Sequence, residues 1–382
     1  MIKKPDIQTQ IVQAEIGTDP AFKSVAPPLY TSSTYLWPSV EEKGPYDYGR
    51  SNNPNREGLA RALAVLEGGE HAVITSSGMS GIDLCLNLIH AEDLIIAPHD
   101  CYGGTHRLLT HRAKQGRIRV LFIDQSDPEA LHAALDEKPK MVLIETPSNP
   151  LMRLVDIKKI AQLSKASGAI VVADNTFLSP VRQTPLALGC DIVIHSTTKY
   201  LNGHSDVVGG AVITKTQAQG EKLDWWANCA GVTGSPFDSW QTLRGLRTLS
   251  ARMDIQERNA MAIAKFLKKH KSIKEIYYPG LKSDPNHKLM KAQQSGPGAM
   301  LSFEVENPDV AAQCLNTIEL FQLAASLGGV ESLICQPSTM THRGMEENAR
   351  IKAGITDNLL RLSVGMEAEN DLIKALRHSL PH

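Results

Sequence analysis

The stretch IVVADNTFLSPVRQTPLALGCDIVIHSTTKY, residues 170–200, decides the fold class because it contains two short apolar runs that each end in a polar side chain. These runs are Ile170–Asp174 and Asp191–His195. Comparable runs rich in β-branched residues occur upstream, at residues 71–75, 93–98, 120–124 and 141–145. Short apolar strands separated by helical segments are typical of a mostly parallel sheet with helices on both faces. The sequence therefore predicts an α/β fold for residues 61–250.

The segments on either side of this alternation have other patterns. Residues 1–60 are rich in Pro, Tyr, Ser and Asn and show little periodicity, which predicts an irregular N-terminal arm. Residues 251–271 are predicted to form a long amphipathic helix, and alternating runs follow at 273–278, 299–304 and 359–364. We therefore expect a large domain at 61–250 and a smaller α+β C-terminal domain at 251–382.

The composition excludes several classes of protein. The chain has 40 Lys and Arg against 41 Asp and Glu, and this near-neutral balance argues against binding to nucleic acid or to an anionic membrane surface. No apolar run is long enough to span a membrane and no apolar signal segment follows the basic N-terminus, so we expect a cytoplasmic protein. The six cysteines are too widely spaced for a zinc clip or a disulfide framework, and we expect no metal. P-loop, GxGxxG, HExxH and GxSxG patterns are absent as well.

In open α/β sheets the site lies beyond the carboxyl ends of the strands, so the polar residues there are the first candidates. They are Thr75, Asp124, Glu145, Asp174 and His195. Asp174 could pair with a protonated ring nitrogen, although a helix cap or loop carboxylate is an equally good interpretation. We expect a structural role for His195.

Two further segments point to a cofactor. In Thr75–Met79, Gly78 allows a close turn before a helix whose first N–H groups could hold a phosphate, although a simple helix cap by Ser76 or Ser77 is the alternative. Lys199 follows a buried strand, where a desolvated lysine can condense with an aldehyde. Ser196 and Thr198 lie two residues apart in a segment expected to be extended, so that both hydroxyls could face one phosphate. An anion cradle, a ring-nitrogen partner and an aldehyde-trapping amine together indicate pyridoxal 5′-phosphate.

The motifs that carry this chemistry resemble those of the Cys/Met-metabolism family of pyridoxal phosphate (PLP) enzymes, over almost the whole chain. The resemblance rests on residues 191–205 and on an ordered series of motifs at 48–50, 53–56, 77–79, 98–104, 145–150, 174–177 and 326–332. It implies the PLP fold type I, which is aspartate aminotransferase-like. Residues 225–228, 231–234, 237–239 and 243–248 are most similar to the bacterial γ-synthases of the family.

The resemblance also implies residue roles. Catalytic roles fall to Lys199, Tyr102 and Tyr48, with Lys199 bonded to the cofactor and Tyr102 stacked on its ring. The implied cofactor contacts are Lys199, Asp174, Tyr102, Gly78, Met79, Ser196, Thr198, Tyr48, Arg50, Asn149 and Thr176. The implied substrate contacts are Arg361, Ser326, Asn149, Arg107 and Asn228, although from the residues alone Arg361 could equally face outward from its strand. Tyr48 and Arg50 are expected to reach a neighbouring subunit's site in a homotetramer made of two active dimers.

The expected reaction is γ-replacement, in which an O-acylhomoserine and L-cysteine give L-cystathionine during methionine biosynthesis. O-succinylhomoserine is the first donor to consider. The alternatives are a cystathionine γ-lyase, which makes cysteine, 2-oxobutyrate and ammonia, an O-acylhomoserine sulfhydrylase, and a regulatory protein on the same scaffold.

Two positions differ from those γ-synthases. Ser51 stands where they typically carry a second arginine, which makes O-acetyl- or O-phosphohomoserine more plausible as donor. Ala325 stands where a glutamate is usual in synthases and γ-lyases, which affects how the distal amino group of cystathionine is held.

Overall fold

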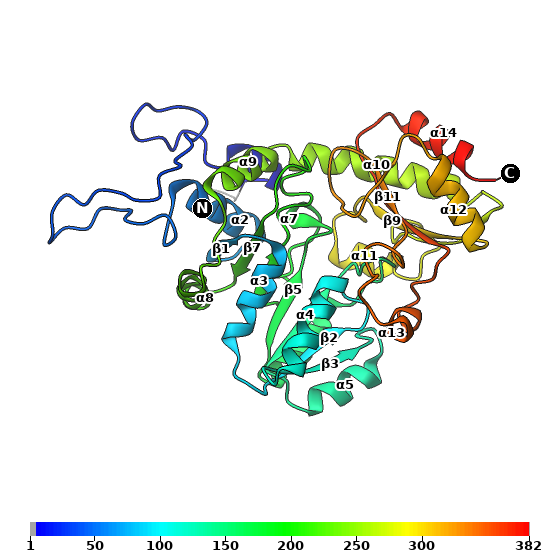
Figure 1. The fold of residues 1–382 in the computed structure, drawn as a ribbon, viewed down its shortest axis with the longest axis horizontal. Coiled ribbons are helices and arrows are strands. Elements are labelled where there is room, and N and C mark those ends of the chain that lie inside the picture. The colour runs from blue at the N-terminus through cyan, green and yellow to red at the C-terminus, as the bar shows by residue number, and fades with distance from the viewer. Residues whose placement is uncertain (1–4, 382) are drawn as a thin grey trace.

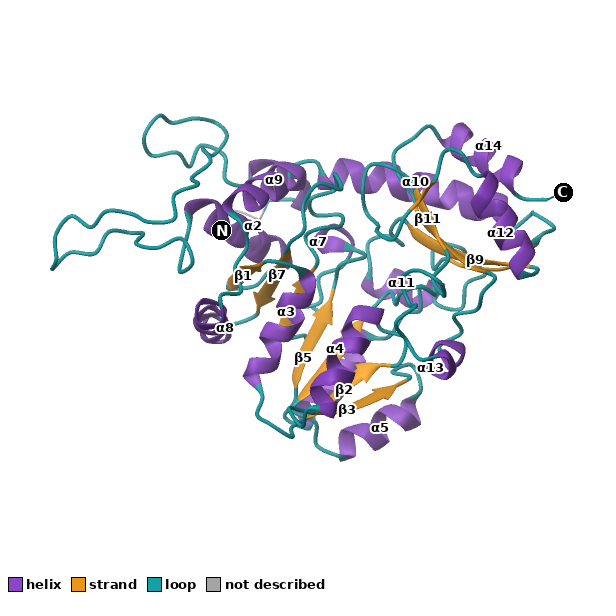
Figure 2. Cartoon of the chain, viewed as in Figure 1, coloured by secondary structure: helices purple, strands orange, loops and turns teal. Residues whose placement is uncertain are grey.

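A seven-stranded sheet forms the centre of the computed structural model, which describes residues 5–381 (Figures 1 and 2). The strand order is β1-β7-β6-β5-β4-β2-β3, and every neighbouring pair is parallel except the two that involve β7. The predicted mostly parallel sheet is therefore confirmed, with β7 as a strand that the sequence did not reveal. The bounds are β1 His71–Thr75, β2 Leu94–Pro98, β3 Arg119–Ile123, β4 Met141–Glu145, β5 Ile170–Asp174, β6 Ile192–His195 and β7 Gly210–Thr214.

Helices cover both faces of this sheet because successive residues of each strand point to opposite sides. On β5, Val171 and Ala173 join one apolar cluster with α2 and α6, whereas Val172 joins a second cluster with α3, α4 and α8. The helix bounds are α1 Ile7–Gln13, α2 Pro54–Glu67, α3 Gly78–Cys85, α4 Gly103–Lys114, α5 Pro128–Asp136, α6 Ile157–Ala166, α7 Ser179–Arg182, α8 Gln217–Ala230 and α9 Pro236–Leu246, with a short 3₁₀ helix at Leu86–Leu88.

A second, five-stranded sheet follows in the C-terminal third, in the order β10-β11-β12-β9-β8. The predicted long helix is present as α10, Leu249–Leu267, which packs against α14, β8 and β9. The other bounds are β8 Ile273–Tyr277, α11 His287–Gln293, β9 Met300–Val305, α12 Pro308–Thr317, β10 Gln322–Leu323, β11 Leu333–Cys335, α13 Glu347–Lys352, β12 Leu359–Ser363 and α14 Glu369–Ser379. The second sheet brings β12 toward the large sheet, and this approach forms the site.

The chain between α1 and α2 contains neither helix nor strand and stands away from the body in two long loops (blue in Figure 1). Three apolar side chains on it, Phe22, Leu36 and Val40, are at least 90% exposed. One isolated bridge, between Thr34 and Tyr48, ties the second loop together. None of the helices within residues 5–381 has the length and apolar character needed to cross a membrane.

Candidate functional site

A cavity of about 440 Å³ lies where the carboxyl ends of β4, β5 and β6 face β12 and the first turns of α3 and α4. This volume is in the range of small-molecule sites. Twelve of the fifteen residues that were predicted to bind the cofactor or substrate or to act in catalysis line it: Gly78, Met79, Tyr102, Arg107, Asn149, Asp174, Thr176, Ser196, Thr198, Lys199, Ser326 and Arg361. The structure therefore brings together residues that lie far apart along the chain.

Lys199 lies just beyond β6 with its amine inside the cavity. The Lys199 Nζ donates a hydrogen bond to the Ser326 hydroxyl at 2.8 Å. Burial lowers the pKa of Lys199 to about 8, and the positive charge of Arg361 contributes in the same direction. The expectation of an extended segment here was wrong, since the Lys199 N–H bonds to the Ser196 carbonyl in a turn over residues 197–200. A lysine with a lowered pKa is suited to attack an aldehyde.

Two carboxylates lie side by side in the cavity, at the ends of β4 and β5. Glu145 and Asp174 are direct neighbours in the sheet register. Asp174 accepts a hydrogen bond from the Thr176 N–H at 3.0 Å. Burial raises the pKa of Asp174, and the hydrogen bonds from Thr176 oppose this. A buried carboxylate of this kind is suited to pair with a protonated ring nitrogen.

The other strand-ending residues do not line the cavity. His195 instead bonds to Glu67 of α2 at 2.6 Å, with both side chains almost fully buried. The Thr75 hydroxyl bonds to the Ser77 carbonyl at 2.8 Å, and Asp124 bonds to Ser126 near the end of β3. Position at a strand end was therefore a useful but incomplete guide to the site.

The start of α3 and the turn after β6 approach each other closely. A Cβ placed on Gly78 would lie 2.9 Å from the Ser196 Cβ, so only glycine fits there without a shift. Ser77 caps α3 in a capping box with Ser80, which leaves the first-turn N–H groups of Gly78 and Met79 without intrahelical partners. The Ser196 N–H donates to the Thr176 hydroxyl, and Thr198 exchanges hydrogen bonds with Gly209. The helix cap considered from the sequence is therefore present, and it leaves the N–H groups of Gly78 and Met79 available to an anion.

Arg361 points into the cavity from β12, not outward to solvent, and its residue is only 2% exposed. Its Nη1 donates to the Asn149 Oδ1 at 2.7 Å, and its Nη2 donates to the Ser326 carbonyl at 3.0 Å. A fixed guanidinium of this kind is well suited to a carboxylate.

Tyr102 and Arg107 enter the cavity from the beginning of α4. A Cβ on Gly104 would lie 2.5 Å from the Tyr102 ring, so the ring packs directly on this glycine. The sequence analysis gave no role to several apolar members of the lining, and two of them, Val208 and Met340, lie outside every family motif. The apolar members without a predicted role are Phe177, Val208, Leu327 and Met340.

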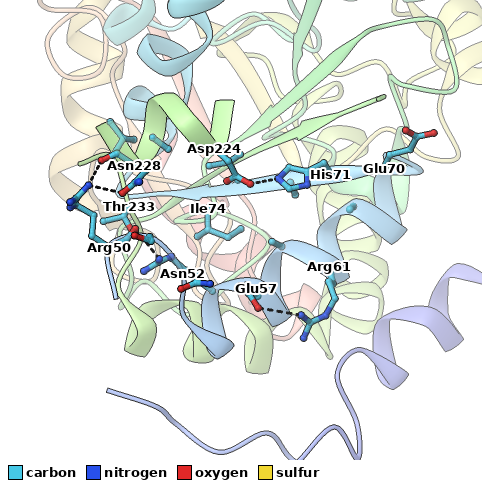
Figure 3. Close-up of a pocket in the computed structure, with 18 residues that line it drawn as sticks. Arg50, Asn52, Glu57, Arg61, Glu70, His71, Ile74, Asp224, Asn228 and Thr233 are labelled. Carbon is cyan, nitrogen blue, oxygen red and sulfur yellow. Dashed lines mark hydrogen bonds and ion pairs between the residues drawn. The ribbon is translucent and has the colours of Figure 1, made fainter. Parts of the chain in front are cut away.

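Three predicted site residues, Tyr48, Arg50 and Asn228, lie outside this cavity. Arg50 and Asn228 line a second pocket of about 320 Å³ between α2, β1 and α8 (Figure 3). The Arg50 Nη1 donates to the Asn228 Oδ1 at 2.5 Å, and the Arg50 guanidinium lies over the Tyr48 ring at 5.5 Å. Within one chain these residues are therefore separate from Lys199.

The donor set of the cavity fits PLP. It offers an N–H cradle for a phosphate, a buried carboxylate for a ring nitrogen, an aromatic ring and an amine with a lowered pKa. No cluster of three or more His, Cys, Asp or Glu residues that could hold a metal ion is found among the described residues.

Comparison with known proteins agrees with this chemistry. A family model described as Cys/Met metabolism PLP-dependent enzyme matches residues 8–381. The chain is 52% identical to a cystathionine gamma-synthase of Escherichia coli strain K12, over 97% of this chain and 96% of the relative. It is 49% identical to a crystal structure of cystathionine gamma synthase from Xanthomonas oryzae pv. oryzae in complex with cystathionine, with a TM-score of 0.97 and 98% of each chain covered.

A lyase relative is somewhat more distant. The cystathionine gamma-lyase of Bacillus subtilis strain 168 is 40% identical over 98% of both chains. The match to the family model and the shared architecture confirm the PLP fold type I and the cofactor. The protein is a PLP-dependent enzyme similar to the cystathionine γ-synthases of transsulfuration, and the chain belongs to the Cys/Met metabolism family of PLP-dependent enzymes.

Proposed function

We propose that this enzyme catalyses γ-replacement, in which the thiol of L-cysteine displaces the acyloxy group of an O-acylhomoserine, released as the free carboxylate, to give L-cystathionine. The placement of the Lys199 amine carries the proposal, because it lies 2.8 Å from Ser326 in a cavity that also contains Arg361. A base between a hydroxyl and a carboxylate-binding arginine is suited to an amino-acid substrate. The relatives named as synthases, at 49% to 52% identity, support the same reaction.

The residues of the cavity are proposed to have separate roles in this reaction. When bound, PLP supplies an electron sink for charge that develops at the substrate α-carbon. Lys199 is the base that removes a proton from Cα and later one from Cβ, and its lowered pKa suits this task near neutral pH. Arg361 and Asn149 hold the substrate α-carboxylate, and Ser326 orients the Lys199 amine. The apolar side chains of Phe177 and Leu327 would limit the access of water to the cavity, which favours capture by a thiol.

Asp174, Tyr102, Thr176 and the residues of the cradle are proposed to hold the cofactor. Asp174 would keep the ring nitrogen protonated and Tyr102 would cover one face of the ring. Gly78, Met79, Ser196 and Thr198 would bind the phosphate.

O-succinylhomoserine is the donor proposed for the first test. Arg107 lies in the cavity and could pair with the far carboxylate of a succinyl group. Ser51 provides no second positive charge, so O-acetyl- and O-phosphohomoserine are the other donors to compare.

A second candidate is sulfhydrylation, with an inorganic sulfide as the acceptor. Ala325 lines the cavity beside Ser326 and offers no carboxylate for an ammonium group. An acceptor without an amino group needs no such carboxylate, and this is the observation that favours the candidate.

We also propose an assembly. Residues 1–60 would form an N-terminal arm that contributes to the neighbouring subunit's site. Residues 61–250 would form the large PLP-binding domain, and residues 251–382 would form the small C-terminal domain. The exposed apolar residues of the arm and the distance of Tyr48 and Arg50 from their own cavity support their use in a neighbouring subunit's site. Two such dimers would form a tetramer.

Product analysis tests the reaction directly. The purified enzyme, loaded with PLP, is incubated with O-succinylhomoserine alone, with L-cysteine and with sulfide, and separately with cystathionine, and the products are identified by mass spectrometry. Cystathionine as the dominant product with cysteine is expected. Release of 2-oxobutyrate from cystathionine, together with no turnover of the acyl donor, would instead assign a γ-lyase. Preference for sulfide over cysteine would assign the sulfhydrylase.

A further inference from the structure

Glu145 is a buried carboxylate of the cavity to which the proposed chemistry gives no role. Its Oε2 accepts a hydrogen bond from the Tyr102 N–H at 2.8 Å, and its carboxylate also accepts from the backbone N–H of Asn149. The residue is 8% exposed and ends β4 beside Asp174. We propose that Glu145 is a positioning residue that holds Tyr102 and Asn149 in place at the cofactor.

The contact with Tyr102 acts on the beginning of α4. Tyr102 is the N-cap of this helix, and its own side chain makes no capping hydrogen bond. Glu145 accepts instead from the N–H of Tyr102 itself, which is the contact that the N3 side chain makes in a capping box, and its carboxylate lies at the end of the helix that the dipole makes positive. The Tyr102 ring then packs on Gly104, so that fixing the backbone of Tyr102 also fixes the ring.

The contact with Asn149 acts on the substrate side. The Asn149 Oδ1 accepts the hydrogen bond from Arg361 at 2.7 Å, and the Asn149 backbone is bonded to Glu145. One carboxylate therefore anchors the aromatic ring that faces the cofactor and the amide that orients the arginine.

The surroundings of Glu145 make an acidic residue costly here. Burial raises the pKa of Glu145, and the nearby carboxylates of Asp174 and Asp100 raise it further, whereas the N–H groups of Tyr102 and Asn149 oppose this. The Cys101 thiol is the other titratable neighbour on this loop, and its own pKa is raised by burial and by Glu145. A carboxylate in such a position contributes little to stability and is better explained by the two groups that it holds.

Cofactor binding tests the proposal independently of which reaction the enzyme catalyses. Apoprotein of Glu145→Ala and Glu145→Gln is titrated with PLP, and the dissociation constant is measured together with the visible circular dichroism per bound cofactor. Leu143→Ala is the matched control, because Leu143 is buried on the same face of β4, two residues away, and does not line the cavity.

We expect Glu145→Ala to weaken PLP binding by about 10-fold and to lower the circular dichroism by about half, since a hydrogen bond to a charged group is lost on each side. Glu145→Gln keeps an acceptor oxygen, so its dissociation constant for PLP and its circular dichroism should lie between those of Glu145→Ala and those of the parent protein. Leu143→Ala should unfold at a lower temperature but keep the parent dissociation constant and dichroism. The proposal is overturned if Glu145→Ala has the PLP affinity and the circular dichroism of the parent protein. It is also overturned if Leu143→Ala reduces the PLP affinity or the circular dichroism as much as Glu145→Ala does.

Discussion

The Lys199 amine is buried beside the fixed positive charge of Arg361, and both features lower its pKa, to about 8. Below this pH the amine is protonated and cannot attack an aldehyde, whereas above it the neutral form predominates. We therefore predict that the rate at which apoprotein reacts with PLP rises about 10-fold per pH unit up to pH 8 and then levels off. Stopped-flow absorbance measures this rate.

Arg361 provides the control for this pH dependence. In Arg361→Gln the neighbouring positive charge is gone, so the inflection should move to higher pH while the shape of the profile is retained. A parent inflection near the ordinary lysine value of about 10.4 would show that Lys199 is not the group that limits the reaction.

Ala325 gives a prediction about acceptor specificity. Glu at this position would place a carboxylate at the cavity edge, next to Ser326, where it could bind the ammonium group of cysteine. We expect Ala325→Glu to lower the KM for cysteine by about 10-fold, the size of one charge-assisted hydrogen bond, without changing the KM for the acyl donor. Steady-state kinetics with each substrate varied in turn checks this. Ala325→Gln has the same length without the charge, and an equal gain in that variant would contradict the electrostatic reason.

The elements around the cavity are held at distances that tolerate little change, and the approach of α3 to the end of β6 is the tightest. Gly78→Ala would place a methyl group 2.9 Å from Ser196 Cβ and 3.0 Å from its Cα, which forces apart both sides of the cradle. We predict about 10-fold weaker binding of PLP, with little effect on binding of pyridoxal, which lacks the phosphate. Fluorescence titration with the two compounds makes the comparison. An equal loss for both would mean that the helix itself, and not the cradle, is disturbed.

A buried polar network ties α2 to the strands below the site. Glu67 Oε1 accepts from the Asn175 amide at 2.8 Å and bonds to His195 at 2.6 Å, directly behind Asp174 and Ser196. Removing one member of a buried pair leaves the other without a partner, so Glu67→Ala should lower the free energy of unfolding by about 3 kcal/mol in urea denaturation. Glu57→Ala on the same helix removes a partly exposed carboxylate that interacts with Arg61 and accepts from the Tyr46 hydroxyl, and it should cost about 1 kcal/mol or less. Similar losses in the two variants would argue against the network.

At this scale the sequence predicted the elements well and the turns between them poorly. The apolar runs located β1 to β6 because each is short, β-branched and followed by a polar residue. β7 was not predicted, because its glycine-led run, Gly210–Thr214, reverses direction after a loop and pairs with both the preceding strand β6 and the distant strand β1. The turn at residues 197–200 was not predicted either. It is stabilised by hydrogen bonds to Ser196 and Gly209, which the local sequence pattern does not indicate. Most of the residues that line the cavity were predicted through family motifs, whereas Val208 and Met340 lie in no such motif, and Phe177 and Leu327 lie within motifs but were given no role.

Predicted site residues of one chain lie in two separate pockets. Lys199, Asp174 and Arg361 share one cavity, whereas Arg50 and Asn228 lie together on another face near the exposed arm (Figure 3). A positive side chain held 2.5 Å from an asparagine at the surface is preorganised for an anionic group. This arrangement supports a dimer in which each arm completes the neighbouring cavity, and it makes a specific prediction for mixed dimers.

Subunit complementation tests the shared site. Lys199→Ala and Arg50→Ala variants should each have low activity alone. When the two are unfolded, mixed in equal amounts and refolded, half of the randomly formed dimers contain one chain of each kind. In every such dimer one site has both Lys199 and Arg50, so about a quarter of all sites should regain the parent turnover. Activity that equals only the sum of the two separate variants would mean that Arg50 acts on its own chain or not at all. A mixture of Lys199→Ala with Asp174→Ala is the matched control, because both residues lie in the same chain's cavity and no intact site can form.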